Sequence, residues 1–190
     1  MIGEHNWAGN HTFQATRIHR PESIGEVRRT IAGASRVHAI GARHSFNAIA
    51  DCAGDLIDLS GIAPDFVIDP DRCTVTGGAG TNYGVLAAWL QREGWALHNM
   101  ASLPHVTLAG ATATGTHGSG DRLGTLSSAV AGLEIVTATG DLLSIGRRDE
   151  SCRRMSSSPG MTGKWDDRGR WKQPRTAATH LQPAIHAMNE

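Results

Sequence analysis

One segment combines small residues with hydrogen-bonding groups in a pattern suited to holding a ligand with the main chain. Residues 109–120 have the sequence Ala-Gly-Ala-Thr-Ala-Thr-Gly-Thr-His-Gly-Ser-Gly. Such side chains fill a core poorly, but they let the backbone approach another molecule closely. The glycines leave N–H groups unshielded, and the hydroxyl groups add short donors. This composition is typical of segments that grip a flat, phosphate-bearing molecule.

A solvated linker is the alternative for residues 109–120, because flexible linkers have a similar composition. The flanking residues argue against it. Leu103, Val106 and Leu108 come shortly before the segment, and Val130 and Leu133 follow it. We therefore expect residues 109–120 to be a functional loop within a packed domain.

A second polar segment, residues 41–47, follows the short apolar run Val37–Ile40. The run predicts a buried strand, and ligands gather beyond the carboxyl ends of strands in sheets of this kind. Residues 78–84 also follow a strand and open a helix, but their glycine spacing is too long for G-x-G-x-x-G. We interpret them as a tight strand-to-helix turn. The histidines lack the spacing of metal ligands on a helix, so we expect no metal site.

The elements that must position these segments alternate irregularly between helix and strand. Capping-box spacing at Ser23–Glu26 predicts a helix start, and apolar periodicity continues that helix to about Gly33. Another helix is expected after Gly84, ending near Gly94. Further strands are expected at 56–59, 66–68 and 74–76, and a hairpin at 130–145 turns at Thr139-Gly-Asp141. The predicted fold class is α+β.

Composition excludes some functions. The 190 residues carry 18 basic and 18 acidic side chains, so no global field favours nucleic acid or an anionic membrane. The first residues lack the basic and apolar regions of a signal peptide, and no apolar run approaches the length of a spanning helix. We expect a cytoplasmic protein without nucleic-acid or membrane partners.

Three separated motifs carry a resemblance to a known family. Residues 39–47, 102–106 and 110–120 together resemble the FAD-binding domain of the vanillyl-alcohol-oxidase (PCMH-type) flavoproteins. They are most similar to the alditol or xylitol oxidases and then to the sugar-lactone oxidases. The resemblance runs from about Asn6 to Ile145. It implies an FAD-binding domain at residues 13–146, made of two packed α+β subdomains and truncated at its C-terminal end.

The resemblance also implies roles for individual residues. His44 resembles the histidine that bonds covalently to the flavin 8α-methyl carbon, and the main chain around it would bind the pyrophosphate. Ser102 is the candidate catalytic residue, near the flavin ring and the substrate hydroxyl. The pyrophosphate donors would come from Gly41, Ala42, Arg43 and Ser45. The other side of the cofactor would be lined by Thr107, Gly110, Thr114, Gly115, Thr116 and His117.

The implied activity is oxidation of a polyol or sugar-derived alcohol. Hydride would pass from the carbinol carbon to the flavin, and dioxygen would reoxidise the flavin to give hydrogen peroxide. A sugar-lactone oxidase relative is one alternative. Another is a non-catalytic, nucleotide-binding fragment, because the family's substrate domain is absent from this chain.

The chemistry of the chain changes abruptly after residue 146. Residues 147–190 carry half of the basic residues and almost no aliphatic ones. A frameshifted or truncated reading would give such a change, as would a genuine disordered tail; we favour the former. We expect this tail to pack little against the domain, to contribute no catalytic group, and to leave Leu142–Ile145 as an exposed edge.

Overall fold

The computed structural model describes residues 3–146, 164–165, 171–172 and 175–185. The helices are α1 (Ile24–Gly33), α2 (Tyr83–Arg92) and α3 (Leu108–Ala113), with short 3-10 turns at Ala48–Ala50, Leu59–Gly61 and Leu126–Ala129. The strands are β1 (Arg17–His19), β2 (Val37–Ile40), β3 (Asp55–Asp58), β4 (Val67–Asp69), β5 (Thr74–Gly78), β6 (Trp95–Leu97), β7 (Val130–Val136), β8 (Leu142–Gly146), β9 (Lys164–Trp165), β10 (Trp171–Lys172) and β11 (Arg175–Ile185).

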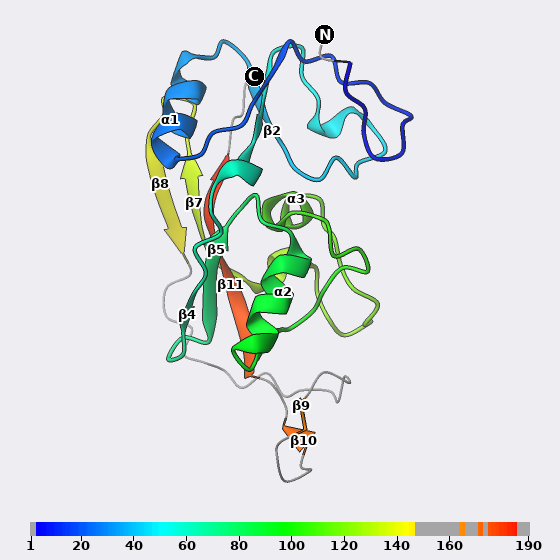
Figure 1. Ribbon diagram of the computed structural model, residues 1–190, viewed down its shortest axis with the longest axis vertical. Helices are drawn as coiled ribbons and strands as arrows, with labels where there is room; N and C mark the ends of the chain where they lie inside the picture. The colour runs from blue at the N-terminus through cyan, green and yellow to red at the C-terminus, as the bar shows by residue number, and fades with distance from the viewer. Residues whose placement is uncertain (1–2, 147–163, 166–170, 173–174, 186–190) are drawn as a thin grey trace.

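The strands form two main sheets, each with its own helices (Figure 1). The smaller sheet has the order β1-β3-β2, with all strands parallel. The larger has the path β4-β5-β11-β7-β8, and β6 pairs with β11. Strands β9 and β10 form a separate antiparallel pair. Helices α2 and α3 lie together on one side of the larger sheet (Figure 1). This arrangement confirms the α+β class with two packed subdomains.

Helix α1 starts where the sequence predicts, because Ser23 caps it. The Ser23 hydroxyl accepts a hydrogen bond from the Glu26 N–H at 3.3 Å, and the Glu26 carboxylate accepts one from the Glu22 N–H at 2.9 Å. The first bond satisfies an N–H group of the first helical turn, and the second fixes the residue before the cap. The apolar face of the helix buries Val27 and Ile31.

Three apolar clusters hold the layers together. One lies between α2, α3 and the larger sheet and includes Leu86, Leu90 and Leu108. A second joins the two subdomains, because it contains Ile31 of α1 and Val136 of β7. The third, built around Phe13 and Leu56, covers the other face of the smaller sheet. The loop after β2 therefore leaves a strand that is packed on both sides.

The sequence analysis misses several elements. It predicts neither β1 nor β6, both of three residues, and it assigns residues 109–120 wholly to a loop, although α3 extends to Ala113. Thr107 explains this helix start, since its hydroxyl accepts a hydrogen bond from the Gly110 N–H at 3.2 Å. The hairpin is found as expected, with Gly140 in the left-handed region at φ +80°.

The structure differs from the expectation that the tail packs little against the domain. Strand β11 lies between β5 and β7, parallel to both. Within the described residues β5 and β7 do not pair with each other, so β11 connects them in the sheet. Residues 147–163, 166–170, 173–174 and 186–190 lie outside the described residues, and the expectation for them stays a prediction. Strand β8 forms an exposed edge of the sheet, as predicted.

Candidate functional site

Thr107 brings two of the predicted cofactor segments together. Its side chain is 7% exposed. A Cβ atom added to Gly41 would lie 2.5 Å from the Thr107 Oγ1 atom, and one added to Gly110 would lie 2.7 Å from the same atom. Both distances are shorter than contacts that a real Cβ makes. The first residue after β2 and the first turn of α3 therefore meet at this hydroxyl group, and both positions require glycine.

The strand-to-helix turn at residues 78–84 binds the start of α3, next to Thr107, through its main chain. The Leu108 N–H donates to the Thr81 carbonyl at 2.8 Å, and the Ala109 N–H donates to the Ala79 carbonyl at 3.0 Å. The Tyr83 and Gly84 N–H groups, at the start of α2, donate to the carbonyls of Val106 and Pro104 at 3.0 and 2.7 Å. This confirms the tight turn. Its main chain fixes the segment that leads into α3.

The second half of the glycine-rich segment turns sharply after α3. Gly115 adopts φ +66°, a conformation that favours glycine. The Thr114 hydroxyl donates to the Gly110 carbonyl at 3.0 Å and lies 3.3 Å from the Thr116 hydroxyl. The backbone of Thr116 is held on both sides, since its N–H donates to Ala111 and its carbonyl accepts from Leu126. His117 is exposed. The turn is thus an ordered part of the fold.

The imidazole of His44 lies among aromatic rings in the 41–47 loop. Its centroid is 4.5 Å from Trp7, 5.8 Å from Phe46 and 4.9 Å from His105. The His105 Nε2 and His44 Nδ1 atoms are 3.1 Å apart, within hydrogen-bonding distance. His105 belongs to the 102–106 motif, so this contact joins the second motif to the first.

The main chain of the 41–47 loop has free donors. Within the described part of the chain, the N–H groups of residues 42–47 donate to no other group. These residues are half-buried as far as Ser45. A pyrophosphate needs several N–H donors that are not shielded by bulky side chains. The loop therefore fits the phosphate part of FAD.

Ser102 is exposed and lies three residues before His105 on the segment held by α2. Its hydroxyl has no hydrogen-bond partner among the described residues. The structure thus places Ser102 on the segment that contacts His44. No hydrogen bond joins Ser102 to the glycine-rich segment within the described residues.

The segment after β6 also comes close to the glycine-rich segment, because a Cβ atom added to Gly118 would overlap the Asn99 Oδ1 atom. Asn99 follows His98, whose two ring nitrogens are buried with no hydrogen-bond partner among the described residues. Burial lowers the pKa of His98 from its ordinary value, so the ring is neutral at pH 7. The segment after β6 therefore packs against the glycine-rich segment through neutral groups.

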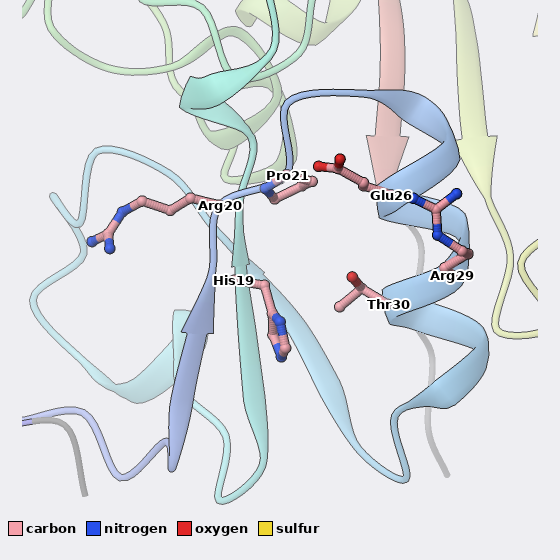
Figure 2. Close-up of a pocket in the computed structure, with 6 residues that line it drawn as sticks. All are labelled: His19, Arg20, Pro21, Glu26, Arg29 and Thr30. Atoms are coloured by element: carbon pink, nitrogen blue, oxygen red, sulfur yellow. The ribbon is translucent and has the colours of Figure 1, made fainter.

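Two shallow surface pockets lie apart from these residues. One, of about 210 Å³, is lined by residues at the end of β1 and along α1: His19, Arg20, Pro21, Glu26, Arg29 and Thr30 (Figure 2). The other lies between α1 and the β7–β8 turn, where the Arg28 Nε atom donates to the Gly140 carbonyl at 2.6 Å. Neither includes a predicted cofactor residue. No three His, Cys, Asp or Glu residues of the described chain gather as metal ligands would.

Sequence reasoning missed the residues that hold the 41–47 loop from the N-terminal side. These are Glu4, Asn6, Trp7 and Asn10. They lie more than 30 positions from the loop, and no local pattern marks them. His105 was visible as part of the 102–106 motif, but nothing in the sequence indicated that it contacts His44. No described helix has the length and apolar character needed to cross a membrane.

Comparisons with known proteins identify relatives of this chain. An alditol oxidase from Streptomyces sp. is 43% identical over 143 residues, which cover 74% of this chain and 34% of the relative. An L-gulono-1,4-lactone dehydrogenase from Mycobacterium tuberculosis is 35% identical over 149 residues, covering 76% of this chain and 35% of the relative. The chain thus spans about a third of the length of these relatives.

The fold is also found in solved structures. Cholesterol oxidase from B. sterolicum matches with a TM-score of 0.65 and 20% identity, over 76% of this chain and 32% of that protein. At this identity the likeness shows the fold alone. A model of the family described as FAD binding domain matches residues 15–146. This confirms the family expected from the three motifs: the chain belongs to the FAD-binding domain family.

Proposed function

We propose that this chain is the FAD-binding part of an oxidase that acts on a polyol or a sugar-derived alcohol. The family match and the alditol oxidase and lactone dehydrogenase relatives support this class of substrate. Bound FAD would supply the acceptor for a hydride from the carbinol carbon, with dioxygen as the final oxidant that gives hydrogen peroxide. A cytoplasmic location stays a prediction.

The observation that carries the proposal is the meeting of Gly41, Thr107 and Gly110. Because Gly41 and Gly110 have no side chains, the backbone after β2 and the backbone of α3 both come close to the buried Thr107 hydroxyl. Next to this junction lies the 41–47 loop, and the N–H groups of its residues 42–47 have no partner in the described chain. Residues 42–45 would donate these N–H groups to the pyrophosphate. Thr114, Gly115, Thr116 and His117 would lie along the other side of the cofactor, as the family resemblance implies.

His44 would hold the flavin covalently through its 8α-methyl carbon. Its ring is fixed by Trp7 and Phe46, and His105 would accept the proton that His44 loses when the bond forms. The new C–N bond would replace one C–H bond of the 8α-methyl group and the N–H bond of His44. This releases two protons and two electrons, which dioxygen would accept to give hydrogen peroxide. An imidazole held by a neighbouring base is a competent nucleophile for this step.

Ser102 would lie near the flavin ring and the substrate hydroxyl. Its segment is fixed at Pro104 and Val106 by the first N–H groups of α2, whereas its own hydroxyl has no partner in the described residues. A free hydroxyl on a fixed segment is suited to donating a hydrogen bond to a bound alcohol or to the ring. Its role would be to orient the substrate.

Titration of the purified chain with FAD, followed by flavin fluorescence, tests the proposal. We expect saturable binding of one FAD for each chain. The same samples are assayed for peroxide with xylitol and sorbitol, and we expect none, because the chain spans a third of the relatives' length. Absence of FAD binding by a folded chain would contradict the proposal. Peroxide formation would show that the remaining two-thirds of the relatives are dispensable.

A further inference from the structure

We propose that residues 4–13, which we call the N-terminal hairpin, hold the 41–47 loop in the conformation that receives the FAD pyrophosphate. Asn6 is the main positioning residue of the N-terminal hairpin. The inference rests on the proposed function, because it assumes that the loop binds FAD. The whole hairpin precedes residues 15–146, which the family model matches.

The hairpin is a defined structure rather than a loose lead. The Asn6 N–H donates to the His11 carbonyl at 3.0 Å, and the Phe13 N–H donates to the Glu4 carbonyl at 2.9 Å. Gly9, at φ +71°, makes the turn. His5 and Thr12 form an antiparallel bridge between the two arms. These contacts fix Asn6 and Trp7 relative to the base of the hairpin.

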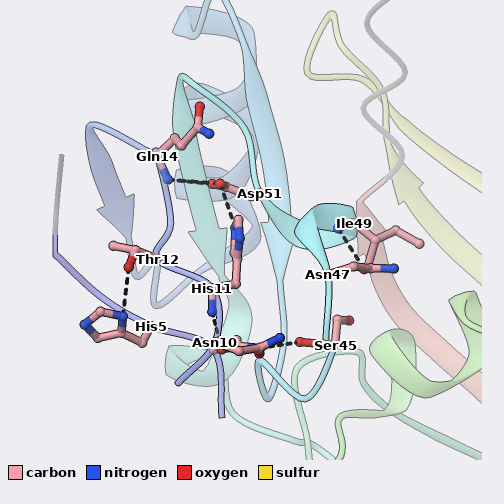
Figure 3. A network of polar contacts seen from close by, with 10 residues as sticks. His5, Asn10, His11, Thr12, Gln14, Ser45, Asn47, Ile49 and Asp51 are labelled. Atoms are coloured by element: carbon pink, nitrogen blue, oxygen red, sulfur yellow. Dashed lines mark hydrogen bonds and ion pairs between the residues drawn. The ribbon is translucent and has the colours of Figure 1, made fainter. Parts of the chain in front are cut away.

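The base of the hairpin is anchored in the smaller subdomain. Phe13 is 2% exposed and packs in the cluster with Ile40 and Leu56. The Asp51 carboxylate, 5% exposed, accepts a hydrogen bond from the Gln14 N–H and lies 3.0 Å from the His11 Nε2 atom (Figure 3). A buried carboxylate with several partners is a strong anchor. The hairpin can therefore act as a fixed support.

The far end of the hairpin holds three carbonyl groups of the loop. The Trp7 N–H donates to the Arg43 carbonyl at 2.8 Å, the Asn6 Nδ2 atom to the Ser45 carbonyl at 2.8 Å, and the Asn10 Nδ2 atom to the Phe46 carbonyl at 3.1 Å. The Glu4 carboxylate pairs with the Arg43 guanidinium. In addition, the Trp7 ring lies against His44.

These bonds decide what the loop can offer to a ligand. Three of its carbonyls are engaged by the hairpin, and its N–H groups at 42–47 remain without a partner in the described chain. Arg43 is held in the left-handed region at φ 58°, which a residue with a side chain adopts only when its surroundings fix it. The Glu4 carboxylate also directs one end of the Arg43 guanidinium toward the hairpin.

Asn6 is the residue on which this arrangement depends most. Asn6 is 5% exposed, and both polar atoms of its side chain form hydrogen bonds. The Nδ2 atom donates to the Asn10 Oδ1 atom at 2.7 Å and to the Ser45 carbonyl, and the Oδ1 atom accepts from the His11 N–H at 3.1 Å. Asp has the same shape and keeps the acceptor for His11. It lacks both donors, so N6D removes the bond to the Ser45 carbonyl and the side-chain bond to Asn10, while the His11 bond of the hairpin is kept.

The test compares N6D, N10A and the control T12V. Thr12 is in the same hairpin, is exposed and bonds the His5 ring rather than the loop. The measurements are the Kd values for FAD and for ADP, which shares the pyrophosphate but lacks the flavin, and amide hydrogen exchange of residues 42–47. We expect N6D to raise both Kd values about tenfold and N10A about threefold, as loss of one or two hydrogen bonds does. We expect faster exchange in the loop and no change for T12V.

Two results would overturn the inference. If N6D and N10A are folded and their Kd values stay within about twofold of the wild-type values, the hairpin does not position the loop, although the chain binds FAD. If N6D does not fold, the exposed position N10A decides alone. Failure of the wild-type chain to bind either ligand would instead overturn the proposed function, and this inference with it.

Discussion

The His105 Nε2 atom lies 3.1 Å from the His44 Nδ1 atom, although the two residues are 61 positions apart in the chain. The contact joins the loop after β2 to the segment before α3. It also places a second imidazole where it would take a proton from the residue proposed to bond the flavin.

The His44–His105 pair predicts that mutations can change covalent attachment of the flavin without changing the affinity for FAD. H44A should abolish covalent flavin and leave FAD binding non-covalent. H105F keeps an aromatic ring but removes the nitrogen, so it should slow covalent attachment at least tenfold with little change in Kd. The fraction of flavin in the acid precipitate, followed over time after FAD is added, measures this. Equal attachment rates in H105F and the wild type would show that His105 has no such role.

The junction at Thr107 predicts a compensating pair of mutations. G41A should weaken FAD binding and destabilise the domain by about 1–3 kcal/mol, because the new Cβ would lie 2.5 Å from the Thr107 Oγ1 atom. T107A removes that atom at the cost of the α3 cap. The double variant should therefore be more stable than the sum of the two single effects.

Urea unfolding of the four proteins gives the coupling energy of this cycle. The next Thr107 atoms lie at 3.6 Å from the added Cβ, which is ordinary contact. Additive effects would mean that the 41–47 loop can move away from Thr107 without loss of stability. The close approach of Gly41 and Gly110 to the Thr107 hydroxyl would then not constrain the site.

The position of β11 predicts that the end of the chain contributes to stability. Truncation after Gly146 removes the strand that pairs with both β5 and β7, leaving two unpaired edges beside the exposed β8. We expect a lower melting temperature and aggregation. Truncation after Ile185 keeps β11 and is the matched control. Equal melting temperatures for both would instead support the expectation that residues 147–190 pack little against the domain.

His98 predicts a pH dependence of stability. Burial lowers its pKa below the ordinary value of 6.5, so below about pH 6.5 the unfolded chain binds a proton that the native chain does not. The free energy of unfolding should therefore fall with decreasing pH in this range, by at most about 1.4 kcal/mol per pH unit from this group.

H98F should remove that contribution. The His11–Asp51 and His19–Asp55 pairs are present in both proteins and cancel in the difference. We expect the variant to gain stability relative to the wild type between pH 7 and pH 5, measured by urea unfolding. Parallel pH profiles would show that His98 takes up its proton over the same pH range in the native and the unfolded protein.

The sequence predicts the parts of this fold that depend on local signals. Ser23 and Glu26 mark the start of α1, and the glycine at 140 marks the hairpin turn, because caps and turns use residues close together in the chain. The motifs at 39–47, 102–106 and 110–120 likewise stand out in the sequence, because each combines particular residue types within a few positions. The roles expected of their residues stay predictions.

What could not be predicted depends on contacts between distant segments. Asn6 holds Ser45, and His105 meets His44, only because the strands and the hairpin bring them together. Similarly, β11 has a polar sequence typical of a tail, yet its backbone has partners on both sides. Pairing along a strand uses main-chain groups, which composition does not reveal.

The visible spectrum of the purified chain, recorded before and after acid precipitation, tests the central claim most directly. After incubation with FAD and removal of the excess, we predict flavin absorption in the native protein and a yellow precipitate, because the proposed bond to His44 would hold the cofactor covalently. A yellow supernatant over a colourless precipitate would contradict covalent attachment alone. A folded chain that remains colourless after incubation with FAD would contradict the account as a whole.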